Sequence, residues 1–359
     1  MEHGAQGGLD GVVVAETAMS DVDGAGGRLT IRGWSVGRLA AAGRLEDTIA
    51  LLWEGEAPGG AASDRIERAL GEARVQAWAA IRGDAALDLP DPAVAARALV
   101  AARSGDDELG LVATVGVAVA AWVQRRTGRA CEPDPALSHA HDLVRLMRGA
   151  PDAPRGTALG RYLCTVVDHG MNASTFAARV VASTGADAAG AVTAAIAALM
   201  GPLHGGAPGP VLDMLDAIGR PEAAAAWIAA ELDAGRRIMG MGHRVYRVRD
   251  PRVAVLEAAI AELGAAGAAT ERLALARAVE QAAEAALARR KPDRPLKANV
   301  EFATAVLLDA VGVPREAFTA TFAAGRVVGW LAHVREQRAL GRLIRPASRY
   351  VGPHASSAT

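Results

Sequence analysis

Apolar residues recur at spacings of three and four along most of this chain, and this feature limits its fold most strongly. A helix has about 3.6 residues per turn, so this spacing gathers apolar side chains on one helix face. Alanine, leucine, arginine and glutamate, all strong helix formers, are abundant in these segments. The pattern predicts helices over Asp47–Trp53, Asp64–Trp78, Asp91–Ala101, Ala136–Met147, Val253–Leu263, Glu271–Leu287, Val300–Val311 and Thr321–Gln337.

Strand-like alternation is confined to the N-terminal region, in Gly11–Glu16 and Arg28–Trp34. The glycine-rich stretch at residues 24–27 between them is typical of a hairpin turn. Helix boundaries are marked by capping and breaking residues at Asp91-Pro92, Ser183-Thr184-Gly185 and Gly312-Val313-Pro314. The sequence therefore predicts an all-α fold with a short N-terminal β-hairpin.

Composition excludes several classes of partner. The 359 residues suit one large or two modest domains, and 51% of them are hydrophobic. The formal net charge of -1 gives no overall attraction for nucleic acid or an anionic membrane. Positive charge comes almost wholly from arginine, whose guanidinium suits bidentate binding of carboxylate or phosphate.

The sequence also predicts a cytoplasmic protein. Cys131 and Cys164 have no metal-ligand spacing and are expected to be reduced thiols. The first residues lack the basic and apolar regions of a signal peptide. The apolar runs at residues 110–123 and 188–201 are shorter than the roughly 18 residues of a membrane span. We expect both runs to be buried core helices.

Two histidines stand in glycine-rich frames that interrupt the helical pattern. His204 lies in Gly201–Gly206, and His243 follows Met239-Gly240-Met241-Gly242. Glycine allows sharp turns and close approach of a ligand, and histidine titrates near neutral pH. We interpret both as candidates for acid–base chemistry, with His204 neutral at a helix N-terminus. The alternatives are a capping or core role for His204 and a solvated basic face around His243.

Several other residues are candidates for binding anions. Arg326 is a single cation inside an apolar helix and requires an anionic partner, either a protein carboxylate or a ligand. Arg247 belongs to a group of arginines just after His243, and Arg345 lies near the C-terminus; either could be a plain surface residue. His169 precedes Asn172 and Ser174, either of which could cap the next helix; alone, this histidine would more often be structural.

Other patterns carry no functional prediction. His139 and His141 are two residues apart, a spacing that does not share a helix face, so we expect exposed side chains and no metal site. Nucleophile-elbow, P-loop and strand-linked dinucleotide motifs do not occur.

Taken together, these motifs resemble those of the citrate synthase family, in its bacterial form. The resemblance runs from Gly8–Val12 to Tyr350–Pro353, and thus over nearly the whole chain. It is carried by Asp168-His169, Asn172–Thr175, Gly201–Gly206, Gly242–Tyr246, Asp250-Pro251-Arg252, Asn299-Val300 and Arg345-Pro346.

The resemblance implies an acyltransferase of the tricarboxylic acid cycle that condenses acetyl-CoA with oxaloacetate and water to give citrate and CoA. It also implies a homodimer of mostly helical subunits with no permanently bound cofactor and no metal, acetyl-CoA being a co-substrate. A large domain would comprise residues 1–206 and 307–359, and a small domain residues 207–306. Substrates would bind in the cleft between the two domains.

The resemblance also assigns roles to single residues. His204 would stabilise the enol of acetyl-CoA, and His243 would protonate the oxaloacetate carbonyl. Glu301 would take the place of the catalytic base. Oxaloacetate would be bound by His169, Arg252, Arg326 and, across the dimer interface, Arg345. CoA would be contacted by Arg247, Met241 and Gly242.

The sequence departs from the family at the base, where Glu301 replaces the usual aspartate. The extra methylene changes the reach of the carboxylate by up to roughly 1.5 Å, one carbon–carbon bond. Ala298 and Pro208 also differ from the residues common in the family. Three hypotheses follow: a citrate synthase that uses glutamate, a 2-methylcitrate synthase that uses propionyl-CoA, and a non-catalytic paralogue that binds CoA esters.

Overall fold

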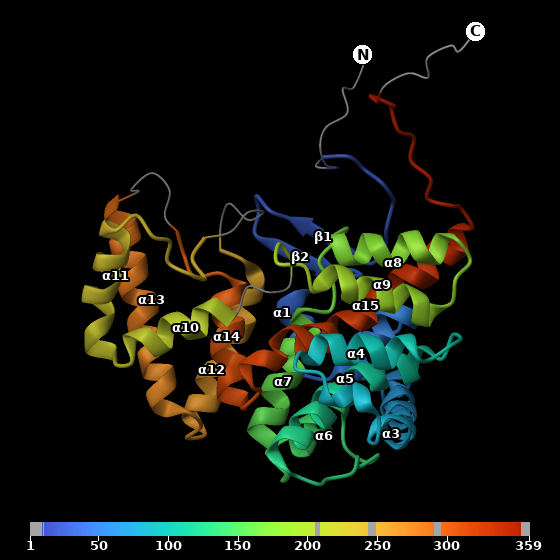
Figure 1. Ribbon diagram of the computed structural model, residues 1–359, viewed down its shortest axis with the longest axis horizontal. Coiled ribbons are helices and arrows are strands. Elements are labelled where there is room, and N and C mark those ends of the chain that lie inside the picture. The colour runs from blue at the N-terminus through green and yellow to red at the C-terminus, as the bar shows by residue number, and fades with distance from the viewer. Residues whose placement is uncertain (1–8, 10, 205–208, 243–248, 291–295, 353–359) are drawn as a thin grey trace.

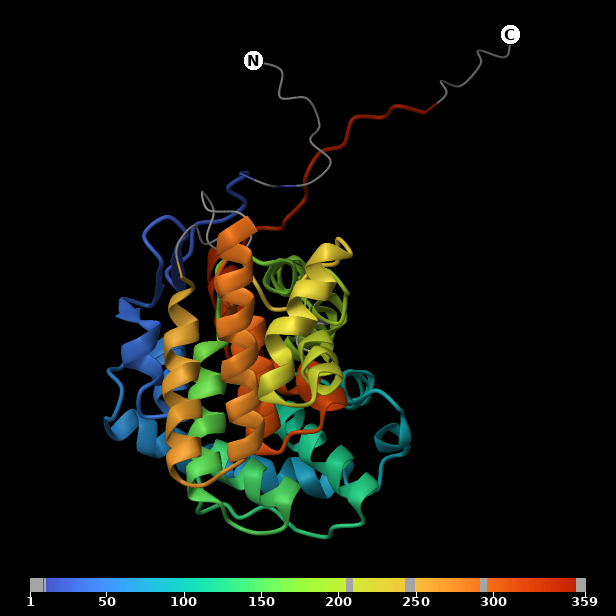
Figure 2. The same ribbon diagram turned by 90° about the vertical axis from the view of Figure 1, so that its left-hand side faces the viewer.

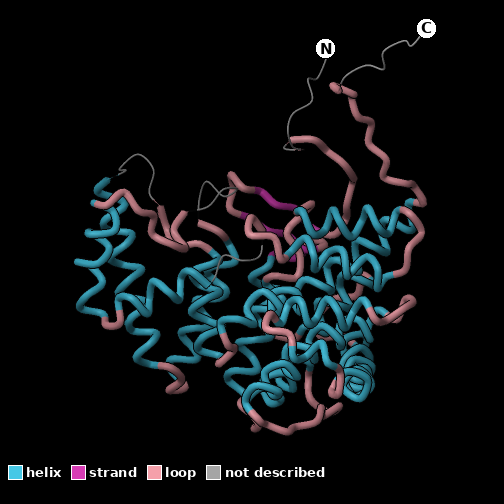
Figure 3. The backbone as a smooth tube through the Cα atoms, in the orientation of Figure 1, coloured by secondary structure: helices cyan, strands magenta, loops and turns pink. Residues whose placement is uncertain are grey.

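The computed structural model describes residues 9, 11–204, 209–242, 249–290 and 296–352 (Figure 1). Helices make up most of this part of the chain (Figure 3). The predicted helix Asp47–Trp53 is divided between an α-helix and a π-helical turn, Ala50–Glu54. The α-helices are α1 (Val36–Ala40), α2 (Leu45–Ile49), α3 (Ala61–Ile81), α4 (Pro92–Ala101), α5 (Glu108–Thr127), α6 (His139–Arg148), α7 (Ala153–Thr165), α8 (Ala173–Ser183), α9 (Ala188–Leu199), α10 (Gly209–Ile218), α11 (Ala224–Asp233), α12 (Pro251–Ala265), α13 (Thr270–Arg290), α14 (Val300–Val311) and α15 (Phe318–Leu340).

The N-terminal sheet has three antiparallel strands in the order β1 (Ser20–Asp23), β2 (Arg28–Ile31) and β3 (Trp34–Ser35). The predicted turn at residues 24–27 joins β1 to β2. The strand predicted over Gly11–Glu16 is wrong, because the residues that directly flank the turn pair instead, as Asp23 does with Arg28. The strand predicted over residues 28–34 is interrupted at residues 32 and 33, both of which have positive φ and reverse the chain.

Capping residues set the helix boundaries as the sequence predicts. Asp91 accepts hydrogen bonds from the backbone N–H groups of Ala93 and Val94, and Pro92 begins α4. Gly312 ends α14 in the left-handed conformation, with φ at 93°. Helix α14 therefore spans the residues that the apolar spacing predicts.

Helices α5 and α9 lie in the core, which confirms their predicted burial. Helix α5 packs against α3, α4, α6 and α15. Helix α5 has 20 residues and is therefore longer than the apolar run that predicts it. By length and composition alone, it could cross a membrane. However, 83% of its most apolar window is buried inside the fold. Its hydrophobicity is therefore accounted for by packing against the surrounding helices.

His139 is fully buried, so the prediction that it is exposed is wrong. It begins α6, and its ring lies against Gly116 of α5, where a Cβ atom would come within 2.6 Å of its Nε2. Glycine on α5 thus makes the space that the ring occupies. His141 is only partly buried and lies 2.8 Å from Ser138 Oγ through its Nδ1.

Helices α10 to α14 form a group at one side of the molecule (Figure 1). Figure 2 shows α11, α12 and α13 there, in yellow to orange. Helix α13 packs on α11, and α14 packs on α10 and α12. Both α12 and α14 also contact α7, which joins this group to the remaining helices. The predicted connector at residues 58–60 is a loop before α3, and the other, residues 291–295, lies outside the described residues.

Candidate active site

His204 lies in the turn that follows α9, with its ring partly buried between α8 and α15. Its Nε2 is 2.9 Å from Ser174 Oγ on α8, and its ring meets that of Phe322 edge-on, with 6.4 Å between centroids. Burial, together with the positive charge of Arg326, lowers the pKa of His204 from 6.5 to about 4. His204 is therefore neutral at pH 7, and burial is the main cause rather than the predicted helix terminus.

Ser174 anchors His204 through a hydroxyl that is fully buried. The indole N–H of Trp330 on α15 donates to Ser174 Oγ at 3.1 Å. The hydroxyl proton then has two possible acceptors, Asn172 Oδ1 at 2.8 Å and His204 Nε2 at 2.9 Å. When it points to His204, the imidazole proton is on Nδ1, on the other side of the ring, and can be donated to a ligand.

Asn172 is the N-cap of α8, accepting a hydrogen bond from the backbone N–H of Thr175. Sequence reasoning named Asn172 and Ser174 as alternative caps and missed the contact of Ser174 with His204. Ser174 and His204 are 30 positions apart in the sequence, so no local pattern could indicate their contact.

Arg326 and Arg252 bring two positive charges close together inside the protein. Arg326 on α15 is 1% exposed, donates from Nε to the carbonyl of Val166 at 2.5 Å and lies over the Phe322 ring. Burial and the charge of Arg252 lower the pKa of Arg326 to about 10, although Asp168 opposes the change. Arg326 remains charged at pH 7. An anion between the two guanidiniums would be stabilised by both.

Arg252 lies in the first turn of α12 and is held by its helix cap. Its Nε and Nη2 contact the two carboxylate oxygens of Asp250 at 3.0 and 2.7 Å. The same carboxylate accepts the backbone N–H of Arg252. This bidentate pairing fixes the guanidinium in a buried position.

Glu301 lies in the first turn of α14, behind the N-cap residue Asn299. The Asn299 side chain accepts hydrogen bonds from the backbone N–H groups of Glu301 and Phe302. Burial raises the pKa of Glu301, while Arg252 and Asn299 oppose the increase. Its carboxylate is thus a stronger base than an exposed glutamate, and it lies within electrostatic reach of Arg252.

Asn299 also joins α14 to the glycine segment that precedes His243. Its side-chain amide donates to the carbonyl of Gly242 at 2.8 Å, and its backbone N–H donates to Gly240. Met241 forms an antiparallel bridge with Ala298. The structure thus places Met241 and Gly242 beside the helix that carries Glu301. His243 and Arg247 lie outside the described residues.

His169 lies in the turn between α7 and α8, partly buried, directly after the fully buried Asp168. Arg345 is exposed in the segment that follows α15, which extends from the body of the chain (Figure 1). Its neighbour Ile344 donates to Ser183 at the C-terminal end of α8, the opposite end from Ser174. A single chain therefore brings together His204, Arg252, Arg326 and Glu301, but does not bring Arg345 to them.

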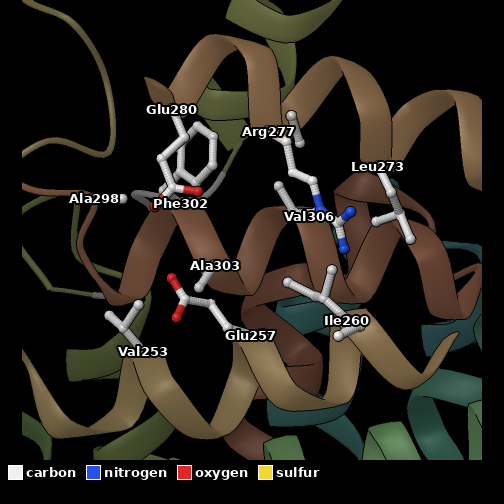
Figure 4. A pocket seen from close by; sticks show the side chains of 12 residues that line it. Val253, Glu257, Ile260, Leu273, Arg277, Glu280, Ala298, Phe302, Ala303 and Val306 are labelled. Atoms are coloured by element: carbon white, nitrogen blue, oxygen red, sulfur yellow. The ribbon is translucent and has the colours of Figure 1, made fainter. Parts of the chain in front are cut away.

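A separate cavity of about 270 Å³ lies between α12, α13 and α14 (Figure 4). Its wall is mainly apolar, and Glu257, Arg277 and Glu280 contribute charged groups. Two of its lining residues, Val253 and Phe302, adjoin Arg252 and Glu301 in sequence, but no predicted site residue lines it. Among the described residues, no group of three or more histidine, cysteine, aspartate or glutamate side chains could hold a metal ion.

The chain is similar to known proteins over almost its whole length. A family model described as citrate synthase, C-terminal domain, matches residues 8–347. A putative citrate synthase 2 from Mycobacterium tuberculosis is 39% identical over 96% of this chain and 92% of its own length. A 2-methylcitrate synthase from the same species is 35% identical, over 96% of this chain and 90% of its own.

A solved structure gives the same result for the fold. It is the ternary complex of carboxymethyl coenzyme A and oxaloacetate with citrate synthase from Thermoplasma acidophilum. The TM-score is 0.83 at 26% identity, with 97% of this chain and 96% of that chain covered. The family match extends over almost the whole sequence, and the fold is shared from end to end. This chain therefore belongs to the citrate synthase family, whose members are condensing enzymes of the acyltransferase type.

Proposed function

We propose that this protein condenses acetyl-CoA with oxaloacetate and water to give citrate and free CoA. The observation that carries the proposal is the neutral His204, anchored on Ser174 and close to the buried cation Arg326. A neutral imidazole still carries one N–H, which can donate a hydrogen bond to an oxyanion. Glu301 lies within electrostatic reach of Arg252, which itself acts on Arg326.

The first step is enolisation of the acetyl group. The Glu301 carboxylate accepts a proton from the thioester methyl group, and His204 Nδ1 donates a hydrogen bond to the thioester oxygen. Burial of Glu301 favours this step because a desolvated carboxylate binds a proton more strongly. The enol carbon then attacks the keto carbon of oxaloacetate, whose oxygen takes a proton from His243. Water hydrolyses the resulting citryl thioester and releases CoA.

Oxaloacetate would be bound by Arg252, Arg326 and His169. A dicarboxylate brings two negative charges, which match the two buried guanidiniums. Arg345 of the partner subunit would complete the site in a homodimer. Two features support the contribution of Arg345 to the site of the partner subunit. Arg345 is exposed, and the preceding residue, Ile344, hydrogen-bonds Ser183 at the end of α8 opposite to Ser174.

Acyl-CoA would extend along the glycine segment, with its adenine against the backbone of Met241 and Gly242 and a phosphate on Arg247. Asn299 hydrogen-bonds both this segment and the first turn of α14, so the CoA site and the base are held by the same side chain. Residues 207–306 would form the small domain. The boundary after residue 306 falls inside α14, so this helix would run from the small domain into the large one.

The direct test is release of thiol from acetyl-CoA in the presence of oxaloacetate, with citrate identified as the product. Glu301→Gln keeps the size of the side chain but removes the base, and we expect activity to fall by at least 10²-fold. Full activity of Glu301→Gln would disprove the assignment of the base. Binding of both substrates by the wild-type protein without any turnover would instead support the non-catalytic paralogue.

A second candidate is a 2-methylcitrate synthase that uses propionyl-CoA, which the 35% identity to such an enzyme supports. The two substrates differ by one methylene, worth only about 1–3 kcal/mol in a pocket. Comparison of kcat/KM for acetyl-CoA and propionyl-CoA would distinguish the two activities.

We also propose a cytoplasmic location, because the structure leaves Cys131 and Cys164 as free thiols.

A further inference from the structure

A fully buried carboxylate precedes His169, and it is held from two sides. Asp168 Oδ2 accepts a hydrogen bond from the Ser20 hydroxyl of β1 and lies 3.3 Å from His333 Nε2 on α15. Burial opposes ionisation of Asp168. The neighbouring His333, Arg326 and Ser20 outweigh burial and hold the pKa of this carboxyl below its usual value. Asp168 is therefore an ionised group in the interior beside the proposed oxaloacetate site.

The tautomer of His333 follows from its other neighbour. Arg179 Nη1 lies 3.0 Å from His333 Nδ1, and a guanidinium can only donate. Nδ1 must therefore accept, which leaves Nε2 as the nitrogen that carries a proton and donates it to Asp168. Arg179 is itself fixed on α8, because it donates to Glu336 at 2.5 Å and to Gln337 at 3.0 Å. The donor to Asp168 is thus oriented by a buried chain of hydrogen bonds.

The carboxylate in turn holds the turn that carries His169. The Ser20 hydroxyl donates to Asp168 and accepts the backbone N–H of Gly170 at 2.9 Å, so it bridges both sides of His169. The carbonyl of Gly170 accepts hydrogen bonds from the backbone and the side chain of Asn172. Asn172 caps α8, and Ser174 lies in the first turn of this helix. Hydrogen bonds therefore connect His333 to the turn at His169 and to the helix that anchors His204.

Asp168 also acts directly on Arg326. Its negative charge raises the pKa of this buried guanidinium, against burial and the repulsion of Arg252. Loss or rotation of the Asp168 carboxylate would therefore weaken two of the proposed oxaloacetate ligands together. A purely structural pair would instead affect folding without preference for one substrate.

We propose that His333 is a positioning residue for oxaloacetate: through Asp168 it orients the turn bearing His169. This inference rests on the proposed function, because it concerns the same oxaloacetate site. It assigns to α15 a second role besides carrying Arg326. It also gives a reason for the buried Arg179, which pairs with the partly buried Glu336 and sets the tautomer of His333.

Two substitutions at this position separate donor from acceptor. His333→Gln can keep an N–H near the position of Nε2, whereas His333→Asn can keep only the acceptor near Nδ1. We expect His333→Asn to raise both KM and the calorimetric Kd for oxaloacetate about tenfold or more, consistent with loss of a hydrogen bond to a charged group. We expect KM for acetyl-CoA to change less than threefold, and His333→Gln to restore most of the oxaloacetate affinity.

Thermal unfolding and ¹⁵N spectra of the histidine rings complete the test. The spectra should show the Nε2–H tautomer for the signal that disappears in His333→Gln; the Nδ1–H tautomer would overturn the inference. If His333→Asn lowers Tm but binds oxaloacetate like the wild type, His333 is structural and the inference fails, although the proposed function stands. If wild-type protein binds oxaloacetate without turnover, the proposed function fails, while the effect of His333→Asn on Kd still decides the inference.

Discussion

His204 Nε2 lies 2.9 Å from the hydroxyl of Ser174, which also receives the indole N–H of Trp330. One buried hydroxyl thus connects the histidine of the turn after α9 to both α8 and α15. The hydroxyl orients the ring and can leave its outer nitrogen protonated. This contact fixes the direction of the imidazole ring.

Replacement of Ser174 by alanine should therefore impair catalysis more than binding. The change removes the partner of His204 and leaves the buried Trp330 N–H without an acceptor. We expect kcat to fall on the order of 10–100-fold, and the free energy of unfolding to fall by about 1–3 kcal/mol. Steady-state kinetics and urea unfolding would measure the two effects. The control is Thr184→Ala, because Thr184 is exposed at the C-terminal end of α8. This substitution should change neither kcat nor the free energy of unfolding.

Glu301→Asp tests whether the backbone of this site is fitted to glutamate. Shortening the side chain withdraws the carboxylate by up to roughly 1.5 Å from a fixed backbone. A misplacement of about 1 Å can cost on the order of 10²-fold in rate, so we expect such a loss in kcat. An aspartate variant as active as the wild type would contradict this expectation and would show that the acyl group can reach either base.

Gly240→Ala should disturb the segment beside Asn299. Gly240 has φ at +73°, and a Cβ atom there would lie 2.8 Å from Phe302 Cβ. We expect a loss of stability of about 1–3 kcal/mol and a higher KM for acyl-CoA. Gly235→Ala is the matched control, because Gly235 has the same φ but open space around it. Equal effects of the two substitutions would show that backbone strain, and not contact with α14, is responsible.

The lowered pKa of His204 makes stability depend on pH in a defined direction. Between about pH 6.5 and pH 4 the unfolded chain binds a proton at this position that the folded chain does not. The contribution of His204 therefore lowers stability as pH falls through this range. Urea unfolding of wild type and His204→Gln at pH 7 and pH 4.5 would measure it. The wild type should lose more stability than the variant; an equal loss would contradict the pKa of about 4.

The acid limit of activity should come from Glu301 and not from His204. The pKa of Glu301 is raised above 4.5, whereas His204 stays neutral down to about pH 4. As pH falls, protonation of Glu301 removes the base first, so kcat/KM should decline while His204 is still neutral. A pH–rate profile checks this. The fall should begin at lower pH in Glu301→Asp if the shorter carboxyl is less desolvated.

Local sequence signals predicted the helices well where caps and breakers are explicit. Asn299 and Gly312 bound α14, and Asp91 with Pro92 begins α4. The first strand was misplaced because alternation over residues 11–16 resembles a strand, whereas pairing depends on which residues flank the turn. Burial of a polar residue was the harder problem. His139 is enclosed because glycine on another helix leaves room for its ring, and spacing within its own segment carries no such information.

Four residues named from the sequence influence one another in the structure: His204 with Arg326, Arg326 with Arg252, and Arg252 with Glu301. Their roles in binding and catalysis stay predictions. The contacts that support these residues were not predicted. Ser174, Trp330, Asp168 and His333 act through contacts between distant segments, and their types are common in any core. Only the three-dimensional arrangement identifies them as supports of the site.

Arg252 and Glu301 occupy the first turns of α12 and α14, two helices that pack directly on each other. Each is preceded by a cap that also hydrogen-bonds it, Asp250 for the arginine and Asn299 for the glutamate. Cation and base are therefore carried by one unit, the packed pair of helices α12 and α14. Any swing of this unit toward α15 would carry both together and leave their separation unchanged. Any change in the pKa of Glu301 would then come from a change in its burial and not from its distance to Arg252.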